Sequence, residues 1–329
     1  MKTRKLGELT VSEIGMGCMG FSHGYGKIPS EDYSIEAIQK ALDYGCNFLD
    51  TSEAYGPCMM QTGHNEKIVG KAIRGRRKDV VLATKLFIGT GEARRGSSAY
   101  DALKRHLEAS MNRLQTDYVD LYYLHRINPS VPVEYVAEGM GLLIDEGLIR
   151  GWGLSMVTTD FIDRAHKVTP VSAVQNIYSM MERDYEKKVI PYCLKNNIGF
   201  VSFSPIASGY LSGKVTTETK FKGDDVRKWV PQLSRENIIA NQPFIDLVTA
   251  MAEKKHTTNA QISLAWMLHK YPHVVPIPGS KNQERILENL EAWKVELSDA
   301  EFQELENALA HIQVYGRRKD VNMGSEYMD

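Results

Sequence analysis

The chain has 329 residues, of which 43% are hydrophobic, so it is long enough to bury one large core. Its 40 basic and 41 acidic residues leave a formal net charge of −1, which excludes a strong long-range attraction to nucleic acid or to an anionic membrane. No apolar run approaches the ~20 residues of a membrane span, the start lacks a secretory signal and the four cysteines have no paired spacing, so we expect a cytoplasmic protein with reduced thiols.

Short apolar or β-branched runs alternate along the chain with longer amphipathic stretches. Residues 2–13 predict a short hairpin that turns at Gly7 and covers the floor of the fold. Eight segments have the composition of strands: 14–18, 46–52, 80–86, 118–125, 149–155, 173–178, 199–205 and 274–279. Helices are predicted between and after them, at residues 30–44, 64–74, 99–114, 132–146, 159–167, 185–196, 243–256, 258–270 and 282–293.

Strands that alternate with helices predict βαβ units and a parallel sheet. Eight such units favour a closed (β/α)₈ TIM barrel over an open sheet, and α/β barrels of this length are often single domains. We therefore expect one domain over residues 1–329, with a long polar loop at 212–241 between strands seven and eight. The polar composition of the tail at 314–329 is consistent with disorder.

The glycine-rich segment at 15–20, GMGCMG, satisfies the dinucleotide-binding pattern G-x-G-x-x-G. That pattern requires a helix that opens directly on the glycines, so that its N-terminus meets the pyrophosphate. Here the next helix is expected only near Ser30, and the acid at the required distance, Asp43, lies late in that helix. We therefore interpret the segment as a glycine-rich strand end and loop above a barrel and not as a Rossmann fingerprint.

Four side chains of different chemistry occupy comparable places on successive strands. Asp50 ends one strand and Tyr55 follows it, Lys85 ends the next strand, and His125 ends the one after. Taken singly, the aspartate could cap a turn, the tyrosine could pack and the histidine could sit hydrogen-bonded in the core. Because the carboxyl ends of all barrel strands face one mouth, we expect the four groups to meet there and form a catalytic site.

These four groups suit the reduction of a carbonyl compound. Hydride that arrives at the carbonyl carbon leaves negative charge on the oxygen, which then needs a proton. Tyrosine, with a pKa of ~10, is a slow acid at neutral pH, and the ammonium of Lys85 would lower that pKa. Asp50 would keep the lysine charged, and His125 would donate a hydrogen bond to the carbonyl oxygen.

Three segments carry a resemblance to a known family: NFLDTSEAYG at 47–56, ATK at 83–85 and YYLHR at 122–126. They resemble the signature segments of the aldo-keto reductases, and GHNEKIVGKAI at 63–73 resembles the second helix of that family. The resemblance covers nearly the whole chain. It implies a nicotinamide cofactor that lies across the barrel mouth without a Rossmann domain. It also implies a catalytic tetrad, with the tyrosine as proton donor, that consists of Asp50, Tyr55, Lys85 and His125.

The resemblance implies further residues for the nicotinamide and pyrophosphate parts of the cofactor. Ser155 and Gln175, which is followed by Asn176, would bind the carboxamide, and Met156 stands where many members have asparagine. Phe203 replaces a tyrosine that stacks on the nicotinamide ring and keeps the aromatic face. The segment at 203–214, FSPIASGYLSGK, would then follow the pyrophosphate, with Ser204, Ile206, Ser208, Leu211, Gly213 and Lys214.

The segment IPGSKNQERILEN at 277–289 resembles the part of the family that binds the adenosine phosphate. Ser280, Lys281 and Arg285 would surround the ribose 2′-phosphate, and two cations near a helix start suit a dianion. The adenine would lie against Glu288 and Asn289. Gly279 stands where many members have a lysine, so we expect NADPH to bind more tightly than NADH but without an extreme preference.

Three functions remain open at this point. The first is NADP(H)-dependent reduction of a small-molecule aldehyde or ketone, and the intact tetrad favours it. The second is a regulatory or scaffold subunit that binds the cofactor on the same barrel. The third is an aldolase or isomerase with Lys85 as a Schiff base, which would leave the segment at 277–289 without a purpose. We expect no metal, because His269 and His273 have a zinc-like spacing but no cysteine pair nearby.

Overall fold

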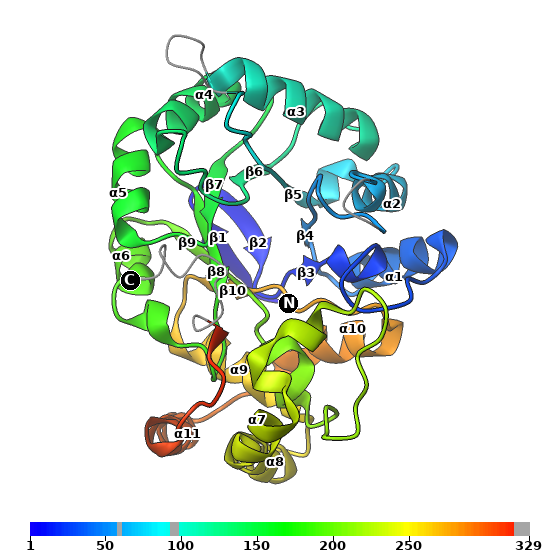
Figure 1. Cartoon of the computed structure of the whole chain (residues 1–329), viewed down its shortest axis with the longest axis vertical. Coiled ribbons are helices and arrows are strands. Elements are labelled where there is room, and N and C mark those ends of the chain that lie inside the picture. Colours follow the sequence, from blue (N-terminus) through cyan, green and yellow to red (C-terminus); the bar gives the residue numbers. More distant parts are fainter. Residues whose placement is uncertain (58–60, 93–98, 319–329) are drawn as a thin grey trace.

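The computed structural model of the chain describes residues 1–57, 61–92 and 99–318. Strands β1 (Thr3–Leu6) and β2 (Leu9–Ser12) pair antiparallel, with Leu6 opposite Leu9. Gly7 makes the turn between them with φ +57°, a left-handed conformation that glycine adopts at little cost. Figure 1 shows this hairpin lying across the end of the strands, so the predicted hairpin is confirmed.

In the described part of the chain, eight parallel strands each pair with the next in chain order, from β3 to β10. Gly17 bridges Gly279, and the N–H of Gly15 donates to the carbonyl of Pro276 at 2.9 Å, so the first strand meets the last. A Cβ at Gly17 would lie 3.0 Å from the carbonyl oxygen of Ile277, which explains the glycine there. The predicted (β/α)₈ barrel is confirmed. Its strands are β3 (Met16–Gly17), β4 (Phe48–Asp50), β5 (Val81–Leu86), β6 (Leu121–Leu124), β7 (Trp152–Ser155), β8 (Ala173–Ile177), β9 (Gly199–Phe203) and β10 (Val274–Pro276).

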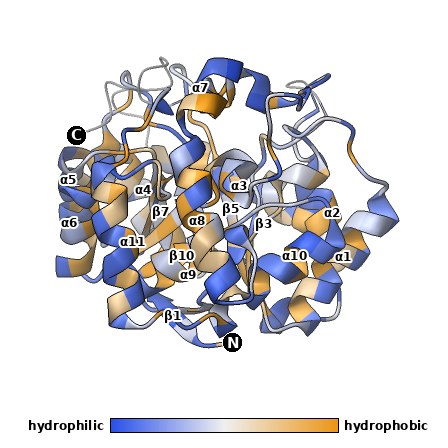
Figure 2. Ribbon diagram, turned by 90° about the horizontal axis from the view of Figure 1, so that it is seen from below, coloured by the Kyte–Doolittle hydropathy of each residue, from blue (hydrophilic) through white to orange (hydrophobic). Residues whose placement is uncertain are grey.

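Amphipathic helices surround the strands (Figure 1). In α3 (Ala99–Leu114), buried residues recur every three or four positions, which gives one apolar face towards the barrel. Figure 2 shows hydrophilic residues over the outer surface of the ribbon. The other helices are α1 (Glu31–Asp43), α2 (His64–Ala72), α4 (Val133–Asp145), α5 (Thr159–Val168), α6 (Val189–Lys195), α7 (Arg235–Ala240), α8 (Gln242–Lys254), α9 (Asn259–Lys270), α10 (Gln283–Leu290) and α11 (Asp299–His311). No helix of the described residues is both long and apolar enough to cross a membrane.

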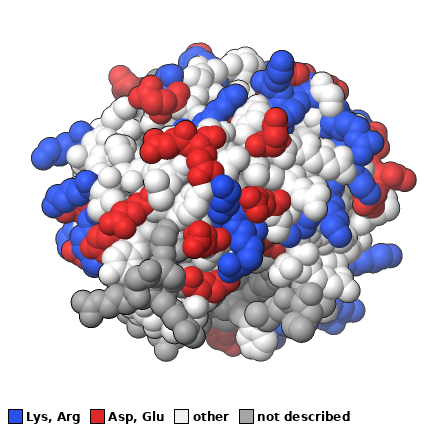
Figure 3. Space-filling model, turned by 90° about the horizontal axis from the view of Figure 1, so that it is seen from above, with Lys and Arg blue, Asp and Glu red and all other residues white. Residues whose placement is uncertain are grey.

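The barrel interior is a packed core that the hairpin closes from below. Leu6 and Val11 of the hairpin are fully buried against inward-facing residues such as Tyr123 and Val201. This packing leaves the other end, where the strands end at their carboxyl termini, as the open face. Figure 3 shows acidic and basic side chains intermingled on the surface seen from above, in keeping with the net charge of −1.

Three parts of the chain differ from the expectation. Helix α11 was not predicted, although Ser298 and Glu301 form the capping box that begins it. The loop at 212–241 contains short helical turns and α7. The first residues of the predicted disordered tail, at 314–318, are tied to the barrel, for example by the Asn241 side chain at the backbone of Tyr315. The rest of that tail, at 319–329, lies outside the described residues.

Candidate active site

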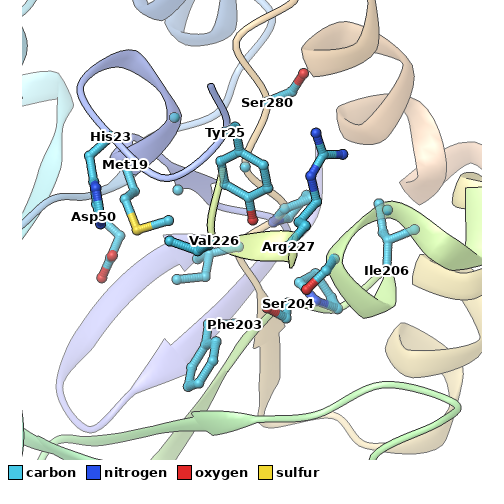
Figure 4. Close-up of a pocket in the computed structure, with 18 of the residues that line it drawn as sticks. Met19, His23, Tyr25, Asp50, Phe203, Ser204, Ile206, Val226, Arg227 and Ser280 are labelled. Carbon is cyan, nitrogen blue, oxygen red and sulfur yellow. The ribbon is translucent and has the colours of Figure 1, made fainter. Parts of the chain in front are cut away.

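A cavity of about 710 Å³ opens at the carboxyl ends of the strands. Its wall is built from segments that are far apart in the sequence. Figure 4 shows Met19, Tyr25, Phe203 and Ser280 around one hollow, with Arg227 beside the tyrosine. The glycine-rich segment at 15–20 contributes to this wall; it contains β3 and the start of a short 3-10 turn at Met19–Phe21, and α1 begins only at Glu31, so no α-helix opens directly on the glycines.

Lys85 joins three of the four predicted catalytic residues. Its side chain is fully buried, and its ammonium donates hydrogen bonds to a carboxylate oxygen of Asp50, to the carbonyl of Thr51 at 2.8 Å and to the hydroxyl of Tyr55 at 3.4 Å. These three bonds use all the donors of an ammonium group. The pairing with Asp50 explains why a lysine can be buried at the end of an apolar strand.

The electrostatics of this cluster differ in one respect from the expectation. Burial raises the pKa of Tyr55 above its usual value, and the ammonium of Lys85 lowers it by less. Lys85 therefore acts in the expected direction, but burial outweighs it because the closed environment disfavours the phenolate. Burial also acts to lower the pKa of Lys85, but Asp50 and Tyr55 raise it above its usual value, so the lysine stays charged.

His125 completes the group at the cavity wall. Its ring packs edge-on against the Tyr55 ring, with centroids 5.8 Å apart, and stacks on Phe87 at 4.5 Å. Its Nδ1 lies 3.1 Å from the hydroxyl oxygen of Ser52. Burial, together with the positive charges of Lys85 and Arg126, lowers the pKa of His125 well below its usual value. The imidazole is therefore neutral at physiological pH.

Glu53 is not a second acid in the cavity. One of its carboxylate oxygens accepts a hydrogen bond from the N–H of Phe87 at 3.2 Å, and the other lies 2.9 Å from Nδ1 of His106. The carboxylate is therefore engaged outside the cavity lining. Glu53 thereby holds the Phe87 backbone and helps to place that ring over His125.

The residues predicted for the nicotinamide have different environments. Ser155 lines the cavity, and its hydroxyl accepts a hydrogen bond from Arg126 at 3.1 Å. Gln175 also lines the cavity; its side-chain NH₂ donates to Asp50 at 2.8 Å, and its amide oxygen accepts no hydrogen bond from the described residues. Asn176 is fully buried, and both ends of its amide bond the backbone of Val157, so its observed contacts tie the end of β8 to the segment after β7.

The segment predicted for the pyrophosphate follows the cavity wall. The backbone of Ser204, Ala207 and Ser208 has φ of +51°, +46° and +56°. Residues other than glycine rarely adopt this left-handed conformation, and it occurs often at ligand sites. Of the residues predicted to follow the pyrophosphate, Leu211 and Gly213 do not line the described cavity. The residues of the set that line it are Phe203, Ser204, Ile206, Ser208 and Lys214.

The residues predicted for the adenosine phosphate lie at the far end of the same cavity, near the start of α10. Lys281 is engaged already, because its ammonium donates to the carbonyls of Tyr25 and Lys27 at 2.7 and 2.6 Å. The guanidinium of Arg285 has no hydrogen bond or ion pair within the described ranges. Six of the predicted residues line this end: Gly279, Ser280, Lys281, Arg285, Glu288 and Asn289.

Sequence reasoning missed several residues that the structure brings to the cavity. Arg126 directly follows His125, so the rule that strand ends face the mouth would have found it. Arg318 lies in the tail and had no signal in the sequence. Trp229, in contrast, is a loop residue that the sequence offers as a candidate for an apolar pocket; it lines the rim and is 71% exposed, whereas the two other such candidates, Met59 and Met60, fall outside the described residues.

Comparison with known proteins relates most of the chain to the family that its signature segments resemble. The model of the aldo/keto reductase family matches residues 13–310. The aldo-keto reductase yakc [NADP(+)] of Schizosaccharomyces pombe is 36% identical over 337 residues, which cover 99% of this chain and 97% of that protein. The chain belongs to the aldo/keto reductase family. The resemblance drawn from the signature segments is therefore confirmed.

Solved structures of other aldo/keto reductases share the fold. The glycerol dehydrogenase AKR11B4 from Gluconobacter oxydans has a TM-score of 0.82 and 26% identity, over 94% of this chain and 95% of that one. An aldo/keto reductase from Klebsiella pneumoniae, in complex with NADP and acetate, has a TM-score of 0.73 and 28% identity, over 96% of this chain and 98% of that one. A further Klebsiella structure is a complex with NADPH, with a TM-score of 0.71 and 28% identity over 93% and 95%.

Proposed function

We propose that this aldo/keto reductase reduces an aldehyde or ketone to the alcohol with NADP(H) as its cofactor. The observation that carries the proposal is the buried cluster of Asp50, Lys85 and Tyr55 beside His125 at the wall of the large cavity. The yeast relative is named for NADP(+), and Klebsiella relatives were solved with NADP and NADPH, which supports this cofactor. A steady loss of NADPH absorbance when an aldehyde is added to the purified protein tests it.

The residues of the cavity fit such a cofactor. The hydroxyl of Ser155 and the amide oxygen of Gln175 can pair with a carboxamide, and the ring of Phe203, which lines the same cavity, offers a flat face. At the other end, Ser280 and the unpaired Arg285 suit a phosphate near the N-terminus of α10. The bound cofactor would supply a hydride to the carbonyl carbon.

The chain itself would supply the proton and stabilise the developing charge. Tyr55 is protonated at neutral pH and can act as the general acid, although burial raises its pKa and so makes its proton harder to release. The ammonium of Lys85 donates to the tyrosine oxygen, which stabilises the phenolate that forms when the proton leaves. Neutral His125 can donate one hydrogen bond to the carbonyl oxygen of the substrate.

Arg285 gives a test of the cofactor. Arg285→Ala should weaken NADPH binding about tenfold, because one charge-assisted hydrogen bond contributes ~1.5–3 kcal/mol, and should leave NADH binding almost unchanged. Fluorescence titration with both cofactors measures the difference. Arg164→Ala, which removes an arginine paired with Glu134 on the outer helices, should change neither affinity. Equal weakening of both cofactors by Arg285→Ala would contradict the assignment of the 2′-phosphate.

Ser52 controls which nitrogen of His125 carries the proton. A neutral imidazole donates to the substrate through Nε2 only when Nδ1 carries no proton, and a donor bonded to Nδ1 favours that tautomer. The Ser52 hydroxyl lies 3.1 Å from that Nδ1 and 3.3 Å from the carbonyl of Lys85. Because Nδ1 is the nearer of the two acceptors, we propose that Ser52 donates to it.

Ser52→Ala should therefore release the tautomer preference of His125. One hydrogen bond contributes ~0.5–1.5 kcal/mol, so kcat/KM should fall by several-fold and by no more than about tenfold. Nitrogen-15 NMR of labelled histidine should show a mixture of tautomers in the variant and the Nε2–H form in the wild type. The control is Ser202→Ala, which removes a buried hydroxyl that donates to the carbonyl of Tyr178 at 2.7 Å. An unchanged tautomer in Ser52→Ala would refute this role.

A further inference from the structure

Besides Arg285 at the adenosine end, two arginines of the cavity form no ion pair with a carboxylate of the described residues. Arg126 and Arg318 both line it, and within the described ranges no carboxylate forms an ion pair with either guanidinium. The third arginine near them, Arg227, is neutralised, because it binds both oxygens of Asp225 at 2.9 and 2.6 Å. The cavity wall therefore holds two guanidinium groups that form no ion pair with a described carboxylate, although the charge of Glu182 acts on Arg318.

Arg126 lies beside the proton donor. Its Nη1 donates to the carbonyl of His125 at 2.6 Å and to the hydroxyl of Ser155 at 3.1 Å, whereas its Nε and Nη2 donate to no residue in the described part of the chain. Its charge acts on Tyr55, where it lowers the pKa against the effect of burial. Because Ser155 is the proposed partner of the carboxamide, Arg126 lies at the nicotinamide end, away from the phosphates of the cofactor.

Arg318 is held in the wall of the same cavity. Its Nη1 donates to the hydroxyl of Ser204 at 3.2 Å, and its backbone N–H donates to Glu182 at 2.9 Å. Burial lowers the pKa of both Arg318 and Arg126, and the positive charge of Arg318 lowers that of Arg126 further. Two like charges that are buried near each other cost free energy, and an anion between them would remove that cost.

We propose that Arg126 and Arg318 form an oxyanion-binding subsite for the substrate, so that the preferred carbonyl compound carries a carboxylate or a phosphate. This inference rests on the proposed reduction of a carbonyl at Tyr55. Arginine presents paired N–H donors that match both oxyanions, and such bonds are stronger when water is excluded. The ring of Phe87, which is stacked on His125 and 42% exposed, offers an apolar surface for the body of that substrate.

Three aldehydes of similar size test the subsite: 4-carboxybenzaldehyde, 4-formylphenyl phosphate and neutral 4-carbamoylbenzaldehyde. The quantity to compare is the ratio of kcat/KM for each anionic aldehyde to that for the neutral one, because losses in folding or cofactor binding cancel within one enzyme form. In the wild type, kcat/KM for at least one anionic aldehyde should exceed that for the neutral aldehyde by about tenfold or more. Arg126→Met and Arg318→Met should each lower this ratio about tenfold, and Arg126→Lys should retain part of it.

Arg285→Met is the matched control, since it removes an arginine from the far end of the same cavity and should leave the ratio unchanged. The anionic aldehyde with the higher ratio identifies the oxyanion. Ratios near one in the wild type would overturn the subsite, while reduction of the neutral aldehyde would leave the proposed function standing. If Arg318→Met weakened NADPH binding and left the ratio unchanged, Arg318 would belong to the cofactor site. That result would also overturn the proposal. If none of the aldehydes is reduced, the proposed function fails and the subsite with it.

Discussion

Tyr55→Phe is expected to lose carbonyl reduction and to keep its affinity for NADPH. The variant retains the ring that packs against His125 and removes only the hydroxyl that Lys85 contacts at 3.4 Å. Loss of a general acid lowers a rate roughly 10²–10⁴-fold, so kcat should fall by that factor. Single-turnover oxidation of NADPH with a saturating aldehyde measures the rate, and fluorescence titration measures cofactor binding.

Tyr192→Phe is a matched control for this variant. It removes a tyrosine hydroxyl that donates to Asp163 between two outer helices, far from the cavity lining. Its kcat should equal that of the wild type. A Tyr55→Phe enzyme with near wild-type turnover would show that another group donates the proton.

Lys85→Met should lower kcat roughly 10²–10³-fold, because a buried donor to the developing phenolate is lost. The sign of the accompanying pKa change follows from the electrostatics. Lys85 acts to lower the pKa of Tyr55, so its removal should raise that pKa further. Carbon-13 NMR of labelled tyrosine can follow the titration, with the Tyr55 resonance assigned by its absence in Tyr55→Phe.

Removal of Lys85 also leaves Asp50 as an unpaired buried carboxylate, which costs about 3–5 kcal/mol of the free energy of unfolding. A double variant, Lys85→Met with Asp50→Asn, removes both charges and should recover stability without recovering activity. Lys270→Met, which removes a lysine bound to Glu186 and Glu306 outside the barrel, should leave the pKa of Tyr55 unchanged. An unchanged pKa in Lys85→Met would show that the lysine does not act on the tyrosine.

Residues fixed by the barrel topology could be predicted from the sequence. Asp50, Lys85 and His125 each end or follow a short apolar strand, and parallel strands bring such positions to one mouth. The alternation of strands and amphipathic helices was sufficient to find the barrel. The capping box of α11 was also readable in the sequence, although the helix was not predicted from it.

What depends on burial or on long-range packing could not be predicted. The raised pKa of Tyr55 results from desolvation, which no motif records. Arg318 reaches the cavity only because the chain after α11 turns back over the barrel mouth. Asn176 matches a family segment, yet its amide is used on the Val157 backbone, and its part in cofactor binding stays a prediction.

The central claim is that a hydride passes directly from NADPH to the carbonyl carbon of a substrate held at Tyr55 and His125. Its most direct test is a reaction with NADPH that carries deuterium at the transferable position of the nicotinamide, followed by mass spectrometry of the alcohol. We expect one deuterium on the former carbonyl carbon of every product molecule, and no alcohol from the Tyr55→Phe variant under the same conditions. Bound cofactor without any alcohol, or alcohol without deuterium, would contradict the account.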